Sequence, residues 1–199
     1  MKHLLGILLA SSILLLTGCA TTISSDVTAY HAWPADLQDK SFVFAPEPQQ
    51  DGDPEYGNYA QLIRFELLRL GFVDAHDATT AALKVNFHYG MQTGTLVVTE
   101  PLYDPMLYGP ARPWRRGPGP FYDPLWAAPM QQTAYPVFER QLDIGIERSS
   151  NGQKLYDVIV HSAGYQGTLP VAMPYMVRSA FAEFPGPSGV QRHVEMEIP

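Results

Sequence analysis

Apolar and polar residues alternate along five stretches of the chain, as expected for strands that bury one face. In the clearest of them, Leu83, Val85 and Phe87 are separated by polar side chains. Asn151 and Gly152 stand between two of the stretches and favour a tight hairpin, because both residues readily adopt positive φ. Residues 95–99 either extend the second strand or pair with it. The predicted strands lie at 41–44, 83–89, 138–147, 154–164 and 190–198.

Two other stretches place their apolar residues at helical spacing. The first follows Asp53, which can cap a helix that begins at Pro54, and Gly71 stands where a left-handed C-terminal residue is common. The second begins near residue 170 or 174 and runs to about Phe184. The order strand, helix, strands, helix, strand predicts an α+β domain with two helices packed on one face of a mostly antiparallel sheet.

Residues 100–136 interrupt this pattern with a long insertion rich in proline, glycine and aromatic residues. A loosely repeated Tyr-Asp-Pro favours turns, so no helix or regular strand is expected there. Long loops of this kind are either functional or weakly ordered, and both interpretations stay open. The functional interpretation is an interaction surface of rigid aromatic anchors with a local positive patch. Its candidate residues are Tyr103, Tyr108, Arg112, Trp114, Arg115, Arg116, Phe121, Tyr122 and Trp126.

The beginning of the chain has the organisation of an export signal. Residues 1–18 combine a basic start with an apolar run that is too short to span a bilayer. They end in the Leu-Thr-Gly of a lipobox, which predicts cleavage before Cys19 and a diacylglyceryl group on its sulfur. Ordinary secretion is the alternative, because small residues also flank conventional cleavage sites. We further expect a lipidated tether at 19–28 and a single periplasmic domain at 29–199.

The residue after the cysteine is Ala20 rather than aspartate, which commonly marks retention in the inner membrane. This favours the outer membrane, with the domain facing the periplasm. Cys19 is the only cysteine, so no disulfide or thiolate metal site is expected in the domain. The formal net charge of −7 argues against nucleic-acid binding, which depends on neutralising phosphates.

No constellation of catalytic residues rises above background. The segment 74–77 is a dense polar candidate for a metal site, but it lies in a loop after a helix, where polar residues are ordinary. His88 and His161 could approach each other only if their strands pair. Ser162 lacks the glycine-flanked turn of a hydrolase nucleophile. We therefore expect no enzymatic activity, no metal and no cofactor.

Several short segments together carry a family resemblance. They are the aromatic strand 42–44, the helix end 68–72, the strand 82–87, the insertion and the later hairpin, and the most specific is Phe-Ala-Glu-Phe-Pro-Gly at 181–186. In this order the chain resembles bacterial envelope lipoproteins grouped as domain of unknown function 4136 (DUF4136). The resemblance spans roughly 27–199 and implies fold and location. It brings no catalytic residue to this chain.

Two hypotheses of function follow. The first is a non-catalytic accessory lipoprotein that is held to a membrane by its lipid and binds another envelope protein, itself or the cell wall. It predicts an exposed aromatic surface formed by the insertion. The second is a carrier or sensor for an apolar or lipid-like molecule. It predicts an apolar pocket between the sheet and the two helices, with the insertion as a lid.

Overall fold

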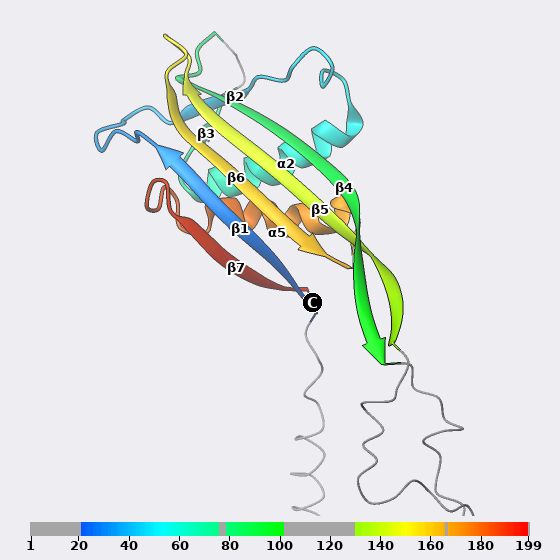
Figure 1. Ribbon diagram of the computed structural model, residues 1–199. Coiled ribbons are helices and arrows are strands. Elements are labelled where there is room, and N and C mark those ends of the chain that lie inside the picture. The colour runs from blue at the N-terminus through cyan, green and yellow to red at the C-terminus, as the bar shows by residue number, and fades with distance from the viewer. Residues whose placement is uncertain (1–20, 76–78, 102–129, 166, 199) are drawn as a thin grey trace, which may run out of the picture.

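One continuous sheet and two helices make up the described part of the chain (Figure 1). The computed structural model describes residues 21–75, 79–101, 130–165 and 167–198. The elements in chain order are β1 (Thr21–His31), β2 (Ser41–Phe44), α2 (Pro54–Arg69), β3 (Val73–Asp74), β4 (Leu83–Pro101), β5 (Met130–Arg148), β6 (Lys154–Gly164), α5 (Leu169–Phe181) and β7 (Gln191–Ile198).

The sheet is mixed, with the strand order β3-β2-β4-β5-β6-β1-β7. Strand β2 pairs in parallel with both β3 and β4, whereas the neighbours from β4 to β7 are antiparallel. The expectation of a mostly antiparallel sheet is corrected accordingly. The physical reason is that α2 connects β2 to β3, and a helical crossover returns the chain in the same direction as it left.

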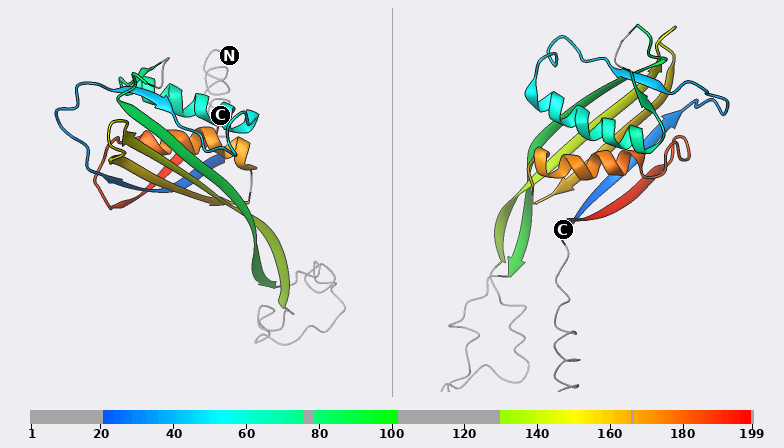
Figure 2. Two further views of the ribbon diagram at one scale, coloured as in Figure 1. Left: turned by 90° about the horizontal axis from the view of Figure 1, so that it is seen from above. Right: turned by 180° about the vertical axis from the view of Figure 1, so that it is seen from behind.

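Both helices lie on the same side of the sheet, next to each other (Figure 2). The side chains between the two layers are apolar and fully buried. From the helices they include Ile63, Leu67 and Met176, and from the sheet Leu142 and Ile144. The opposite side of the sheet carries mostly polar side chains, so the core is confined to one face.

The first helix begins and ends as its sequence predicts. Asp53 lies at the N-cap, and its Oδ1 accepts a hydrogen bond of 2.9 Å from the backbone N–H of Glu55. Gly71 closes the helix with φ +82°, a conformation that glycine adopts without strain. The second helix begins at Leu169, so the start near residue 170 is the better of the two expectations. It ends at Phe181, three residues before the expected end.

Phe184, in the segment that gives the family resemblance its most specific motif, joins an aromatic cluster at one end of the core. Its ring centroid lies 5.0 Å from that of Trp33, 4.7 Å from that of Tyr156 and 5.7 Å from that of Phe72. These contacts join the loop after β1, strand β6 and the end of α2 to the chain after α5. The motif is therefore explained by packing.

Strand β1 corrects the predicted tether. Residues 21–28 are not a linker but part of β1, which is paired with β6 on one side and β7 on the other. Ile23, Val27 and Ala29 are buried, with Val27 0% exposed. The Ser and Thr residues of this segment concealed the alternation, because Ser25 faces inward between Ile23 and Val27 and interrupts the apolar face.

The predicted insertion is shorter than expected. Strand β4 continues through the stretch 95–99 and reaches Pro101, while β5 begins at Met130. Residues 95–99 therefore extend the predicted strand, which was the first of the two alternatives. The two strands stay paired to their ends, where Pro101 faces Met130. The expectation that no regular strand occurs in 100–136 is therefore wrong at both margins of the segment.

The place of β1 in the core can be tested by a single truncation. Val27→Ala should lower the free energy of unfolding by about 2 kcal/mol, because it removes buried methyl groups and leaves a cavity. Urea unfolding of the domain measures this, with the exposed Thr22→Ala in the same strand as control. A tether would tolerate both substitutions equally, and equal stabilities would contradict the strand assignment.

Candidate functional site: a projecting arm and the cavities at its base

The expected site residues lie outside the part of the chain that the structure describes. This holds for Cys19 and for the whole predicted interaction surface, namely Tyr103, Tyr108, Arg112, Trp114, Arg115, Arg116, Phe121, Tyr122 and Trp126. The structure does describe the strands that lead into and out of the segment 102–129. The candidate site is therefore built from those strands and from what surrounds their base.

Beyond the body of the sheet, β4 and β5 continue as a two-stranded ribbon, which we call the arm (residues 90–101 and 130–139) (Figure 1). Pairing of β4 with β2 ends at Val85, and pairing of β5 with β6 ends at Phe138. Along 90–101 and 130–137, each strand therefore has one neighbour among the described strands. Its other edge has no strand partner there, and such edges readily meet another surface.

The surface of the arm is nearly free of charge. Glu100 and Glu139 are its only ionisable acidic or basic residues, whereas 17% of the whole chain is Asp, Glu, Lys or Arg. Exposed apolar side chains take their place: Leu96 is 41% exposed, Val97 54% and Met130 65%. Exposed apolar residues that cluster on one element are typical of contact surfaces.

Tyr135 joins the two strands of the arm through its side chain. Its hydroxyl donates a hydrogen bond of 3.2 Å to Oε1 of Glu100 on the facing strand, and this bond raises the pKa of the tyrosine above its ordinary value. Its ring also meets that of Tyr165, edge to face, with centroids 6.4 Å apart. One of the two carboxylates of the arm therefore has a hydrogen-bond donor on the facing strand.

A buried arginine holds the base of the arm. Arg140 in β5 is only 3% exposed and points toward the helix side of the sheet. Its Nε and Nη2 donate to the carbonyl of Gly167, and Nη1 donates to Oγ of Ser162 at 3.4 Å. Ser162 Oγ in turn donates to the carbonyl of Ser24 in β1, at 2.8 Å. Burial lowers the pKa of the guanidinium.

These bonds connect the arm, β6, β1 and the loop before α5. A cavity of about 340 Å³ adjoins Arg140, between Ser24, Tyr165 and Val171. The arginine was missed by the sequence analysis, although a signal existed. Position 140 falls on the inward register that Leu142, Ile144 and Ile146 occupy, so a charged residue there had to be buried.

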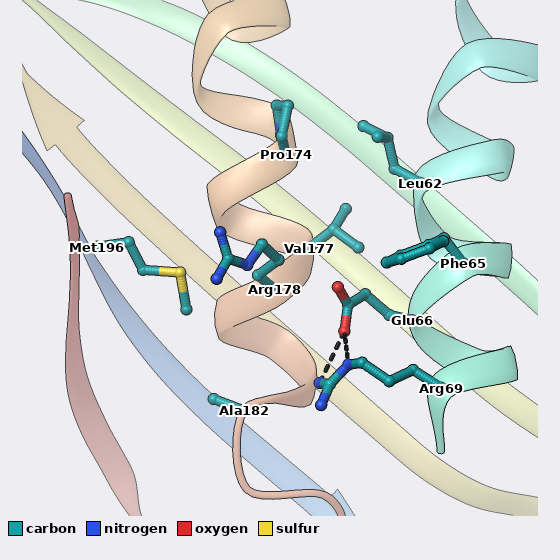
Figure 3. Close-up of a pocket in the computed structure, with 9 residues that line it drawn as sticks. All are labelled: Leu62, Phe65, Glu66, Arg69, Pro174, Val177, Arg178, Ala182 and Met196. Atoms are coloured by element: carbon teal, nitrogen blue, oxygen red, sulfur yellow. Dashed lines mark hydrogen bonds and ion pairs between the residues drawn. The ribbon is translucent and has the colours of Figure 1, made fainter. Parts of the chain in front are cut away.

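A second hollow lies on the two helices (Figure 3). It has a volume of about 560 Å³, and Leu62 and Phe65 of α2 point across it toward Val177 of α5. Glu66 lies beneath, 5% exposed, and its Oε2 accepts from Nε and Nη2 of Arg69, each at 2.8 Å. This carboxylate also falls on the apolar stripe of the helix, which was a readable signal. The two contacts with Arg69 give the buried carboxylate a partner of opposite charge.

The polar candidates do not form a catalytic centre. His88 and His161 lie on β4 and β6, which are separated by β5, so their strands do not pair. Asp74 forms an ion pair with Nε of Arg64 at 2.8 Å, while residues 76 and 77 lie outside the described part. Among the described residues, no group of His, Cys, Asp and Glu could hold a metal ion.

One histidine is electrostatically tied to a carboxylate on the open face of the sheet. Nδ1 of His193 in β7 lies 2.8 Å from Oδ1 of Asp26 in β1. This hydrogen bond raises the pKa of His193 and lowers that of Asp26. Both groups are solvated, and the pair joins an edge strand to its neighbour.

In the described chain, no helix has the length and hydropathy needed to cross a bilayer.

These features define the class of the protein. It is an α+β domain whose helices cover one face of a mixed sheet and whose two central strands extend into an arm. The chain belongs to the family described as domain of unknown function DUF4136, whose sequence profile matches residues 26–186. The match leaves out β7, which sequence periodicity alone predicts.

Solved structures that resemble the chain include the following three. A PDZ domain protein from Parabacteroides distasonis matches with a TM-score of 0.50 and 11% identity over 94% of this chain. The match covers 41% of that protein, so the chain spans about two-fifths of its length. The sequence matches no curated protein significantly.

The other two structures are less similar in shape. A DUF4136 family protein from Bacteroides thetaiotaomicron has a TM-score of 0.35 and 11% identity, with 82% of this chain and 97% of that one covered. The PelC dodecamer from Paraburkholderia phytofirmans gives 0.38 and 13%, with 79% and 96% covered.

The role of Arg140 can be tested by a change that retains its charge. Arg140→Lys should loosen the loop 164–168, because an ammonium group cannot bond to both Gly167 and Ser162 as the fork of a guanidinium does. Amide hydrogen exchange in this loop should speed up by about tenfold or more, a loss of about 1.4 kcal/mol of local stability. Arg148→Lys, at the far end of β5, is the matched control. Unchanged exchange in the Arg140 variant would show that the arginine does not hold the loop.

Proposed function

We propose that this chain is a lipoprotein of the bacterial cell envelope that acts without catalysis, by holding a contact surface close to a membrane. In this proposal residues 1–18 direct export and are removed. Cys19 then carries the diacylglyceryl group and a further acyl chain. Two or more acyl chains make membrane attachment effectively permanent, whereas one is marginal. The outer membrane, facing the periplasm, is the proposed location.

The observation that carries the interaction role is the arm. Both ends of the segment 102–129 emerge at its far end, at Pro101 and Met130, away from the core. A chain that only needed to connect β4 to β5 could turn directly at the edge of the sheet. The arm instead keeps twelve residues of β4 and ten of β5 paired outside the core, with little charge on their surface. This favours a partner-binding role for the aromatic and arginine residues between them.

The partner class that we propose is another envelope protein, a second copy of the chain or the cell wall. The mature domain has an excess of acidic residues, which disfavours nucleic acid. Among the described residues, no group of His, Cys, Asp and Glu could hold a metal ion, and the proposal assigns no catalytic role to any residue. The proposal therefore includes no cofactor.

The carrier function stays as a second candidate because of the hollow over α2 and α5. Its lining includes Leu62, Phe65 and Val177, and its volume is within the range of small-molecule sites. It differs from the site that the sequence suggested. The space between the sheet and the helices is filled by core side chains such as Ile63 and Leu142, so a ligand would have to bind outside the helices.

Lipidation has a direct test. Cells that express the chain and are fed radiolabelled palmitate should yield a labelled band, and Cys19→Ser should abolish the label because the sulfur is the acceptor. An inhibitor of lipoprotein signal peptidase should leave a heavier form, retaining residues 1–18. A wild-type protein that is secreted unlabelled would refute the anchor and favour ordinary secretion.

The interaction role is tested by shortening the chain at the arm. Residues 102–129 are replaced by Asn-Gly, which can join Pro101 to Met130 as a two-residue hairpin because these residues face each other. The control carries a segment of the same length with its aromatic residues changed to serine. After cross-linking in intact cells, we expect a discrete adduct only with the unmodified chain. Identical adducts from all three forms would exclude the segment as the contact surface.

A further inference from the structure

The anchor and the arm lie at the same end of the sheet. The register places Asp26 of β1 opposite His161, His161 opposite Gln141, and Gln141 opposite Gly90. From this row, β1 continues for five residues toward its start at Thr21. In the same direction, the two strands of the arm continue for eleven residues, to Pro101 in β4 and to Met130 in β5. The arm therefore projects six residues past the start of β1, about 20 Å at about 3.3 Å per residue. Figure 1 shows the arm extending beyond the end of the sheet where β1 begins.

The chain available to the anchor is much shorter than this projection. Our inference rests on the proposed lipid at Cys19, which precedes Thr21 by only two residues. Two residues span at most about 7 Å. With its acyl chains in the membrane, the lipidated cysteine would hold the start of β1 at the lipid surface. The arm extends about 20 Å further than the start of β1 in the same direction. A domain held in this way would therefore place its arm in the lipid layer.

The surface chemistry of the arm suits a lipid surface. Leu96, Val97 and Met130 expose apolar side chains, and Tyr135 has the amphipathic ring typical of membrane interfaces. No lysine or arginine lies on the arm, and Glu100 is bonded to Tyr135. The described residues of the arm therefore offer no positive charge to anionic lipids. Its binding should depend on apolar contact alone.

The free strand edges limit how deep the arm can go. Backbone N–H and C=O groups without partners are very unfavourable in the hydrocarbon layer but can bind water among headgroups. The exposed edges along 90–101 and 130–137 therefore confine the arm to the interface between headgroups and acyl chains. We propose that the arm of the anchored protein lies in the headgroup region of the membrane that carries its lipid, and that the described residues Leu96, Val97 and Met130 contact lipid there.

The single native cysteine makes this testable with site-specific labels. Acylation blocks the sulfur of Cys19, so an introduced cysteine is the one reactive thiol. Val97→Cys carries a bimane fluorophore on the arm, and Asn151→Cys carries it in the exposed turn at the opposite end of β5. Each lipidated full-length protein is reconstituted into vesicles of phosphatidylcholine and phosphatidylethanolamine, with and without a lipid bearing a nitroxide near the headgroup. We expect the nitroxide lipid to reduce the Val97 signal at least twofold and to leave the Asn151 signal unchanged.

Several outcomes would overturn the proposal. If both labels keep their intensity in vesicle-bound protein, the arm does not touch lipid. If the Val97 label is shielded from aqueous iodide and yet escapes the nitroxide lipid, a second copy of the chain covers the arm instead. Quenching that appears only when anionic lipid is added would show that Leu96, Val97 and Met130 do not bind lipid by apolar contact.

Failure of the anchor is recognised separately. Vesicles are floated on a density gradient before the fluorescence is read, and the Cys19→Ser protein serves as the reference without an anchor. If the wild-type protein fails to float, the lipid at Cys19 is refuted and the inference about the arm falls with it. If the wild-type protein floats and the Val97 label is not quenched, only the position of the arm is refuted.

Discussion

The continuous pairing of β4 with β5 is the constraint on which the rest of the structure depends. From Leu83 opposite Arg148 to Pro101 opposite Met130, the register does not shift. Because the side-chain period of a strand is two, this register decides which residues face the helices in the sheet and which are exposed along the arm. A slip of one residue would turn Leu83 and Val85 to the solvent side. The core and the arm are thus two parts of one ladder.

Some elements were predictable from the sequence because their signals are local, and others were not because they depend on distant partners. Helix α2 was predictable because local signals agree: a capping Asp53, a first-turn proline and a closing Gly71. Strand β1 was not, because Ser and Thr, which are typical of linkers, occur on both of its faces, with Ser25 buried between Ile23 and Val27. Only its partners β6 and β7, distant in sequence, make it a strand. The parallel pairing of β2 likewise depends on where α2 returns the chain.

The candidate site divides in the same way. Glu66 and Arg140 could have been found, since each is a charged residue in an apolar register, and such a residue needs a partner when buried. Most of the arm was not predicted from the sequence, because Gly94, Pro101 and Pro136 are residues that strands usually avoid. What distinguishes it is the pairing of Pro101 with Met130, a contact across the whole segment 102–129. Local sequence patterns carry no information about a contact of that range.

The position of β1 next to the proposed lipid relates the anchor to the arm. A long tether would separate the domain from the membrane and leave the direction of the arm without consequence. Because residues 21–28 are paired in the sheet, the length of free chain is reduced to two residues, and the sheet itself becomes the element that fixes distance from the surface. Strand β7 closes the outer edge of β1, so β1 cannot leave without exposing Val27 and Ile23. The orientation of the arm then follows from the register of the sheet. Its apolar side chains favour entry into the lipid, whereas its strand edges, which have no partner among the described strands, oppose deep entry.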